Sequence, residues 1–172
     1  MGVFDGLFML PLGVSAVTVG FGLLVTLDRP PLDLRASPWL VPIAQTMVAL
    51  PLVVRVIVPA LRSVPQRQRE AAATLGAGPL RSFLTVELSA AWRSVLAAAG
   101  LAFAVSLGEF GATSFLVRPD NPTLPVVIFS LLARPTPGSF GVALAASVVL
   151  AVLTAGVAAA VERVRGGWIG GF

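Results

Sequence analysis

The sequence predicts an all-α protein, a polytopic membrane helix bundle with about four transmembrane helices, a cytoplasmic loop and a short external helix. Three observations support this fold class. Of the 172 residues, 56% are hydrophobic and 12% charged, and the mean hydropathy is +0.93. The apolar stretches reach the length of about 20 residues that one helical crossing of a bilayer requires. Short clusters of proline and arginine separate these stretches, so residues 1–172 are expected to form a single membrane domain.

The predicted spans are long, apolar and nearly free of charge. They cover residues 7–27, 38–61, 94–117 and 140–161. The first span is expected to remain in the protein, because the residues before it include Asp5 and no lysine or arginine, unlike a cleaved signal. Residues 126–133 are apolar but too short to cross a bilayer, and prolines flank them. This pattern indicates a re-entrant or interfacial helix on the external side.

The arginines predict the orientation of the spans. Seven lie in the central loop and the C-terminal tail, at positions 62, 67, 69, 81, 93, 163 and 165. Four lie in the loops on the other side, at positions 29, 35, 118 and 134. Because short cytoplasmic loops carry an excess of positive charge, we expect the central loop and both termini to lie in the cytoplasm. Arg55, near the end of the second span, can extend toward the headgroups.

Several residue types are missing from the sequence, and their absence excludes several classes of function. There is no cysteine, histidine, tyrosine or lysine. Disulfides, Cys/His metal sites and Ser-His or Cys-His catalytic pairs are therefore excluded, as is a lysine-containing nucleotide-binding loop. The arginines form no basic stripe, which argues against nucleic acid as a partner. The sequence predicts no catalytic residues, no metal ligands and no cofactor.

Small residues recur at intervals of four in the last two predicted spans. The series are Gly100, Ala104, Gly108 and Ala112, then Ala143, Ser147, Ala151, Ala155 and Ala159. Such series let helix backbones approach closely in a membrane. A chain this rich in alanine also produces them by chance, and in either case they concern packing and not a substrate.

The central loop, residues 62–93, carries the strongest functional signal. Ser63 and Gln66 have the spacing of a capping box, which predicts that a helix begins there. Gly76 is expected to end this helix, and Pro79 to start a second one. The second helix places apolar residues on one face, namely Leu80, Phe83, Leu84 and Leu88. Within the first helix, Glu70 stands beside small alanines, so a partner can fit this surface and pair an arginine with the acid.

The residues of this loop resemble the "EAA" loop of type I ABC importer permeases, whose pattern is Glu-Ala-Ala-x3-Gly-x9-Ile-x-Leu-Pro. The matching positions are Glu70, Ala71, Ala72, Gly76, Val86 and Leu88. Val86 replaces the isoleucine, and Ser89 replaces the proline. In that family the loop is a coupling helix that docks on a cytoplasmic ATPase subunit, and its glutamate faces a basic residue there. The alternative for these residues is a plain surface helix.

A second string resembles one branch of the same permeases. Residues 106–113 read Ser-Leu-Gly-Glu-Phe-Gly-Ala-Thr, and residues 121–125 read Asn-Pro-Thr-Leu-Pro. The branch transports ferric iron, thiamine, molybdate or sulfate, and the second string is most similar to the iron and thiamine members. Glu109 lies in the first string. A carboxylate within a span points to a gate or pathway, and the alternative is that it caps a helix or pairs within an interface.

The resemblance implies a permease subunit of an ATP-driven importer in the cytoplasmic membrane of a prokaryote, moving a small solute of the iron, thiamine or oxyanion class. Its implied partners are a cytoplasmic ABC ATPase, a second permease half or homologous subunit, an extracytoplasmic solute-binding protein and membrane lipid. The family core has at least five spans, and the first span here resembles the second of them. The chain is therefore expected to be a C-terminal piece that does not transport by itself.

Two rival functions follow from the same sequence. The chain could be a non-transporting membrane scaffold or assembly protein whose central loop docks a cytoplasmic partner without energy coupling. An intramembrane hydrolase is weakly supported, because it needs aspartate or serine pairs deep within spans and only Glu109 is present there.

Overall fold

The computed structural model describes residues 13–29, 33–34, 37–134 and 136–166, and this part of the chain is almost entirely helical. The elements are α2 (Ala16–Thr26), α3 (Leu40–Arg62), α4 (Gln66–Thr74), α5 (Pro79–Ser82), the π-helix η2 (Phe83–Glu87), α6 (Leu88–Gly108), α7 (Thr113–Leu116), α8 (Leu124–Ala133) and α9 (Ser139–Gly166). The predicted all-α fold class is confirmed.

Three helical stretches of the described residues are long and apolar enough to cross a membrane. They are Leu40–Arg62, Pro79–Gly108 and Ser139–Arg163. The first and third agree with the spans predicted at residues 38–61 and 140–161. Helix α8 occupies the position predicted for the short interfacial or re-entrant helix. Of the span predicted at 7–27, α2 accounts for 11 residues, and residues 7–12 lie outside the described part.

The span predicted at residues 94–117 has different bounds in the structure. The helix begins in the central loop and continues through α5, η2 and α6 to Gly108. At Glu109 the backbone leaves the helical region, with φ −70° and ψ 120°, and α7 starts at Thr113 as a separate short helix. The residues on both sides of this break are mainly apolar. A prediction from apolar composition therefore placed the end of the span at residue 117, after the true end of α6 at Gly108.

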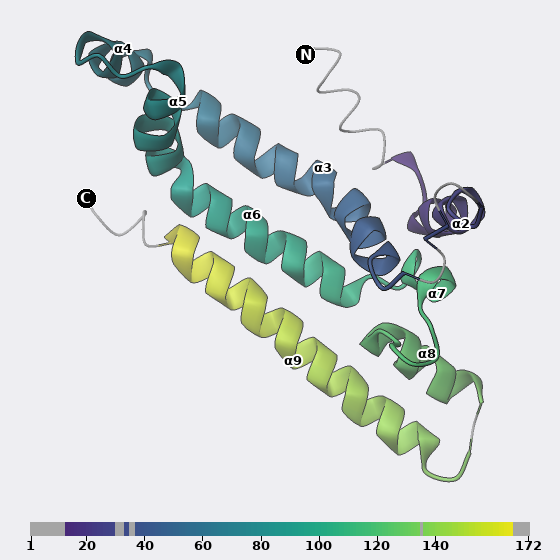
Figure 1. Ribbon diagram of the computed structural model, residues 1–172. Coiled ribbons are helices and arrows are strands. Elements are labelled where there is room, and N and C mark those ends of the chain that lie inside the picture. The colour runs from purple at the N-terminus through teal and green to yellow at the C-terminus, as the bar shows by residue number, and fades with distance from the viewer. Residues whose placement is uncertain (1–12, 30–32, 35–36, 135, 167–172) are drawn as a thin grey trace.

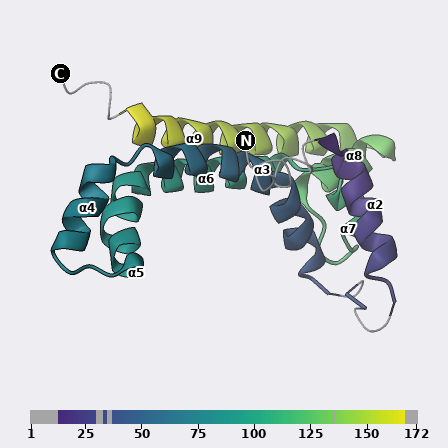
Figure 2. The same cartoon turned by 90° about the horizontal axis from the view of Figure 1, so that it is seen from above.

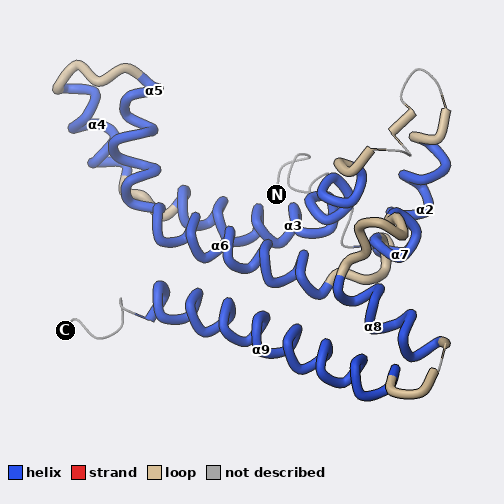
Figure 3. Tube along the Cα trace, turned by 60° about the horizontal axis from the view of Figure 1, so that its bottom comes forward, coloured by secondary structure: helices blue, strands red, loops and turns tan. Residues whose placement is uncertain are grey.

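The long helices lie side by side and the short ones gather at the two ends. Helix α6 packs against α3 on one side and α9 on the other, and α8 folds back along α9 (Figures 1 and 3). The α4–α5 hairpin projects from one end of α3 and α6, whereas α2, α7 and α8 lie at the opposite end (Figure 2). A cluster of Leu40, Ala44, Ala112 and Leu116 forms a small buried core at this opposite end.

Two glycines allow close approach between helices. A Cβ atom at Gly20 of α2 would lie 2.5 Å from the backbone of Ala112, so only glycine fits where α2 crosses the start of α7. A Cβ at Gly100 of α6 would collide with the side chain of Val161 on α9. Close helix packing at these points agrees with the expectation for small residues in membrane helices.

The alanine series of α9 does not form a packing ridge along the whole helix. Ala143 is buried, but Ala151, Ala155 and Ala159 are exposed. Each step of four residues rotates the position by about 40° around an α-helix, so the series winds away from α6. Most of the α9 residues that stay at least partly buried follow intervals of three and four, at positions 139, 143, 147, 150, 154, 157 and 161. Within the described residues, the predicted ridge is therefore packed only over its first half.

Candidate functional site

The hairpin of α4 and α5 begins without the predicted capping box. Ser63 directly follows α3 as its C-cap and keeps helical backbone angles. Its hydroxyl donates to the carbonyl of Ala60 at 2.7 Å. Pro65, with φ −60° and ψ 135°, occupies the extended position before α4. The capping position thus falls two residues later than the sequence predicts, because proline takes this extended geometry readily and Ser63 remains bonded to its own helix.

The far end of α4 is built as predicted around Gly76. Its φ is +79°, a left-handed conformation that glycine adopts without a steric penalty. The N–H of Gly76 donates to Ala73, and the N–H of Ala77 donates to Ala72, both at 3.0 Å. These two bonds form a Schellman motif, which satisfies the last carbonyls of α4 and reverses the chain toward Pro79.

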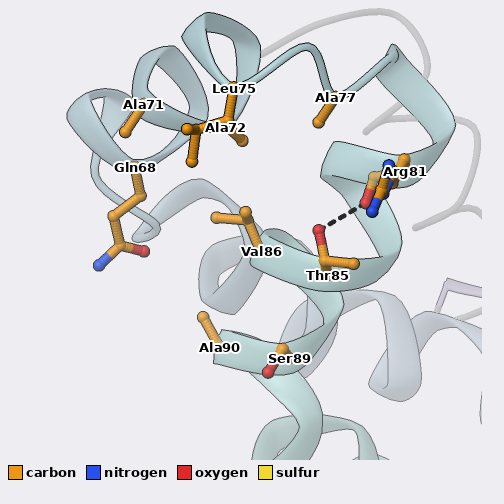
Figure 4. A pocket seen from close by; sticks show the side chains of 10 residues that line it. All are labelled: Gln68, Ala71, Ala72, Leu75, Ala77, Arg81, Thr85, Val86, Ser89 and Ala90. Atoms are coloured by element: carbon orange, nitrogen blue, oxygen red, sulfur yellow. Dashed lines mark hydrogen bonds between the residues drawn. The ribbon is translucent and has the colours of Figure 1, made fainter.

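Between the two arms of the hairpin lies an open groove of about 690 Å³ (Figure 4). It is lined by Gln68, Ala71, Ala72, Leu75, Ala77, Arg81, Thr85, Val86, Ser89 and Ala90. Ala71 and Ala72 come from α4 and Ala77 from its turn. Thr85 and Val86 come from η2 opposite them, and Ala90 comes from the start of α6 (Figure 4). Because most of these side chains are small, the groove is shallow, and its floor is mainly apolar.

The structure brings three of the candidate residues together and leaves three beside the groove. Ala71, Ala72 and Val86 line it. Glu70 is exposed on the same helix as the alanines, and Gly76 forms the turn at the tip. Leu88 is half-buried and does not line the groove.

Other residues of the groove were not singled out from the sequence. Arg81, Thr85 and Ser89 follow one another at intervals of four, and the Thr85 hydroxyl donates to the Arg81 carbonyl at 2.7 Å. Their helical spacing around Val86 is the signal that could have identified them. Leu75, which also lines the groove, is 87% exposed, a large apolar surface for a residue of this type.

The apolar face predicted on the second helix exists but has little cover within the described residues. Leu80 is 72% exposed, and Phe83 and Leu84 are exposed as well. Together with Leu75, these side chains give the tip of the hairpin an apolar surface. Such a surface on a projecting element is typical of an interaction site.

Arg69 was also not singled out, yet it makes the main polar contacts of the hairpin. Its Nε atom lies 3.2 Å from Oε1 of Glu87 in η2, an ion pair. Its Nη2 atom donates to the carbonyl of Leu61, in the last turn of α3, at 3.1 Å. A single side chain on α4 therefore contacts the elements on both sides of it.

Glu109 lies at the other end of α6 and is 7% exposed. One carboxylate oxygen accepts the N–H of Ala112 at 2.7 Å, and the other accepts the N–H of Thr113 at 3.0 Å. The Thr113 hydroxyl donates to the Glu109 carbonyl at 2.8 Å. Of the two roles considered for this acid, the geometry favours the cap: it satisfies backbone groups at the start of α7.

A second cavity, of about 390 Å³, lies at this same end of the molecule. Its polar lining residues are Asp28, Asp33 and Arg118, and its apolar ones come from α2, α3, α7 and the residues directly after α7. In the predicted orientation this cavity opens on the external side.

Comparison with known proteins identifies the family. The family described as "Binding-protein-dependent transport system inner membrane component" matches residues 2–166. The chain belongs to this family. The match includes the whole α4–α5 hairpin, the three long helices and the α6–α7 break, so the predicted resemblance to type I ABC importer permeases is confirmed.

Curated relatives of this permease agree with that assignment. The putative 2-aminoethylphosphonate transport system permease protein PhnV of Salmonella choleraesuis (strain SC-B67) is 30% identical over 163 residues, which cover 95% of this chain and 60% of that protein. The molybdenum transport system permease protein ModB of Escherichia coli (strain K12) is 34% identical over 145 residues, covering 76% of this chain and 63% of that protein. The chain thus spans about three fifths of the length of these two relatives.

The family is described as an inner membrane component, and three helices of the described residues are long and apolar enough to cross a membrane, so the permease is a multi-pass protein of the inner membrane. The names of the two relatives refer to an aminophosphonate and to molybdenum. They give no support to the iron and thiamine members that residues 121–125 suggested as the most similar.

Proposed function

We propose that the permease is a membrane-spanning subunit of an ABC importer and that a separate cytoplasmic ATPase docks on the α4–α5 hairpin. The observation that carries this proposal is the groove between the arms of the hairpin. It presents Ala71, Ala72 and Val86 at the end of two long apolar helices, where a partner outside the membrane can reach it (Figure 1).

The chemistry of the hairpin suits a protein partner that inserts an element between its arms. Small side chains leave room for the backbone of the partner, and the exposed Leu75 and Leu80 offer apolar area around the groove. Glu70, exposed beside the alanines, can form a charge-assisted hydrogen bond with a basic residue of the ATPase. ATP hydrolysis in that subunit then moves the hairpin, and with it α3 and α6.

The proposed solute is a small anion of the oxyanion class. The names of the relatives support it, because a phosphonate is a tetrahedral oxyanion and molybdenum exists in neutral water as one. In the complete importer, a solute-binding protein delivers the anion outside, and a second permease half or homologous subunit completes the pathway. Glu109 stays a candidate gate position within this proposal, because its cap lies at the break between α6 and α7. An interrupted helix at membrane depth is tolerated where protein covers it or where it lines a cavity.

A single introduced cysteine tests the docking. The chain contains no cysteine, so an Ala72→Cys variant carries the only thiol. In membranes from cells that express the importer, we expect a maleimide to label this position, and the cognate ATPase subunit to protect it. Asn121→Cys, exposed at the opposite end, is the matched control and should be labelled equally with or without ATPase. Equal labelling of Ala72→Cys in both conditions would remove the coupling role and favour the scaffold function.

A further inference from the structure

The α4–α5 hairpin joins the rest of the molecule through two weak backbone connections. At one side, residues 63–65 link α3 to α4 without helical hydrogen bonds continuing through Pro65. At the other side, Gly76 and Gly78 lie in the turn between α4 and α5. Glycine places few restrictions on backbone rotation, so helix α4 could pivot at both ends if nothing else held it.

Arg69, near the start of α4, holds this helix to the end of α3 and to η2. Its guanidinium contacts the carbonyl of Leu61 at 3.1 Å and the carboxylate of Glu87 at 3.2 Å. The Leu61 carbonyl is one of the last carbonyls of α3, where the helix dipole favours a cation. Glu87 is the last residue of η2, directly before α6. The set of Arg69, Leu61 and Glu87 is called the Arg69 junction below.

The π-helix η2 helps to complete this junction. The N–H of Leu88 donates to the carbonyl of Phe83, five residues earlier, so this turn contains one residue more than an α-helical turn. The extra residue rotates the position of Glu87 around the helix, and in this position its side chain reaches Arg69. Helix α4 also packs directly against η2.

Burial distinguishes the junction from an ordinary surface ion pair, which contributes little because water screens it. The side chains of Arg69 and Glu87 are 34% and 23% exposed. The Nε atom of Arg69 is itself buried and makes no hydrogen bond within the described residues, so its contact with Glu87 is an ion pair without hydrogen-bond geometry. By contrast, Arg67 on the same helix is exposed.

We propose that Arg69 is a positioning residue that makes α4, the end of α3 and the start of α6 move as one unit. The proposal rests on the function proposed above, in which the ATPase moves the hairpin. A displacement of α4 is then transmitted through the guanidinium to two spans that pack along each other. Without the junction, α4 can rotate about its glycine turn, and ATP is hydrolysed with less movement of the spans.

The first measurement tests how firmly the hairpin is held, and it uses the permease chain without its ATPase or binding protein. Spin labels on Gln66→Cys in α4 and Leu96→Cys in α6, both exposed, report the distance between the two helices. We expect a narrow distance distribution with Arg69 present and a broader one in Arg69→Ala. Arg67→Ala is the matched control and should keep the narrow distribution. A distribution of unchanged width in Arg69→Ala overturns the proposal.

The second measurement concerns transmission in the complete importer, reconstituted in liposomes with its ATPase and binding protein. The probes are molybdate and 2-aminoethylphosphonate, and the readout is solute taken up per ATP hydrolysed. The alanine variant loses the charge-assisted contacts that favour the closed junction over an open, hydrated one. We therefore expect Arg69→Ala to lower this ratio about threefold or more. Binding of the ATPase should remain within about twofold of wild type, since Arg69 lies outside the groove.

Two further variants separate a positioning role from a general loss of stability. Arg69→Lys, which keeps the charge, should recover part of the ratio. Exchanging the charges in an Arg69→Glu/Glu87→Arg double variant should recover more of the narrow distribution than Arg69→Glu alone, which places two carboxylates together. Loss of ATPase binding in parallel with uptake overturns the proposal. An inactive wild-type importer would contradict the proposed function instead, and the distance measurement would still decide whether the junction exists.

Discussion

At the scale of single residues, Glu70 and Glu109 show how one side-chain type acts differently in two surroundings. Glu70 is exposed on α4, and no described contact of the fold depends on its carboxylate. Its carboxylate is therefore accessible to the partner proposed above. Glu109 is buried and satisfies two backbone N–H groups, so its value lies within the chain.

For Glu70, we predict that replacement by glutamine weakens ATPase binding and leaves the fold unchanged. The substitution keeps the size of the side chain and removes the charge, so about a tenfold loss of affinity is expected at low salt, and less at high salt, where screening is stronger. Titration of the permease in nanodiscs with the cognate ATPase measures this. Gln66→Glu, on the same helix, is the control for nonspecific charge effects. Equal affinity of Glu70→Gln and wild type at low salt would contradict the role.

For Glu109, we predict that Glu109→Gln lowers the free energy of unfolding by about 1–3 kcal/mol, because an amide NH₂ replaces an oxygen that accepts a backbone N–H in a buried site. Glu162→Gln, on the exposed side of α9, should change it by no more than about 0.5 kcal/mol. Chemical unfolding in detergent, followed by circular dichroism, compares the two. If both variants are equally stable, the cap is unimportant and the gate is the better account of this acid.

At the scale of elements, α2 can pack closely on the start of α7 because Gly20 has no Cβ atom. Replacing glycine by alanine within a helix ordinarily stabilises it by about 1 kcal/mol. We predict this gain for Gly22→Ala, where a Cβ meets no atom within 4 Å, and a loss for Gly20→Ala, where it meets the backbone of Ala112. The melting temperatures of the two purified variants give the comparison. A gain at both positions would show that α2 is not packed on α7.

The sequence predicts a helix well where its apolar composition determines its bounds. It predicts the bounds poorly where individual hydrogen bonds determine them. Helices α3, α8 and α9 follow from apolar length, and the turn at Gly76 follows from the conformational freedom of glycine. The end of α6 could not be predicted in this way, because residues 110–117 are as apolar as the span before them and only the bonds of Glu109 interrupt it.

The residues of the candidate site also differ in how far the sequence predicts them. Ala71, Ala72 and Val86 were found by a spaced motif and do line one groove. The Arg69 junction joins residues that are 8 and 18 positions apart, so it exists only after the hairpin folds and the π turn aims Glu87. A pattern of residue types within one helix contains no information about such a contact.

At the scale of the whole molecule, the two ends of α6 carry different chemistry. One end holds the hairpin with its groove, and the other holds the α2, α7 and α8 cluster with the second cavity (Figure 2). Helix α9 closes one side of α6 and exposes large apolar side chains on its outer face, such as Val148 and Val152. In the proposed importer, this face is available to lipid or to the second permease half.

The orientation of these two ends is the last prediction, and it decides whether the ATPase can reach the groove at all. The distribution of seven arginines on one side and four on the other predicts that the hairpin lies in the cytoplasm. In intact cells, an impermeant maleimide should label Asn121→Cys, at the end of the α2, α7 and α8 cluster, and should label Arg67→Cys only after the membrane is opened. Both residues are exposed, so access to the reagent and not burial determines the result. The reverse pattern would put the groove outside the cell, where no ATPase subunit is present, and would exclude the importer mechanism for this hairpin.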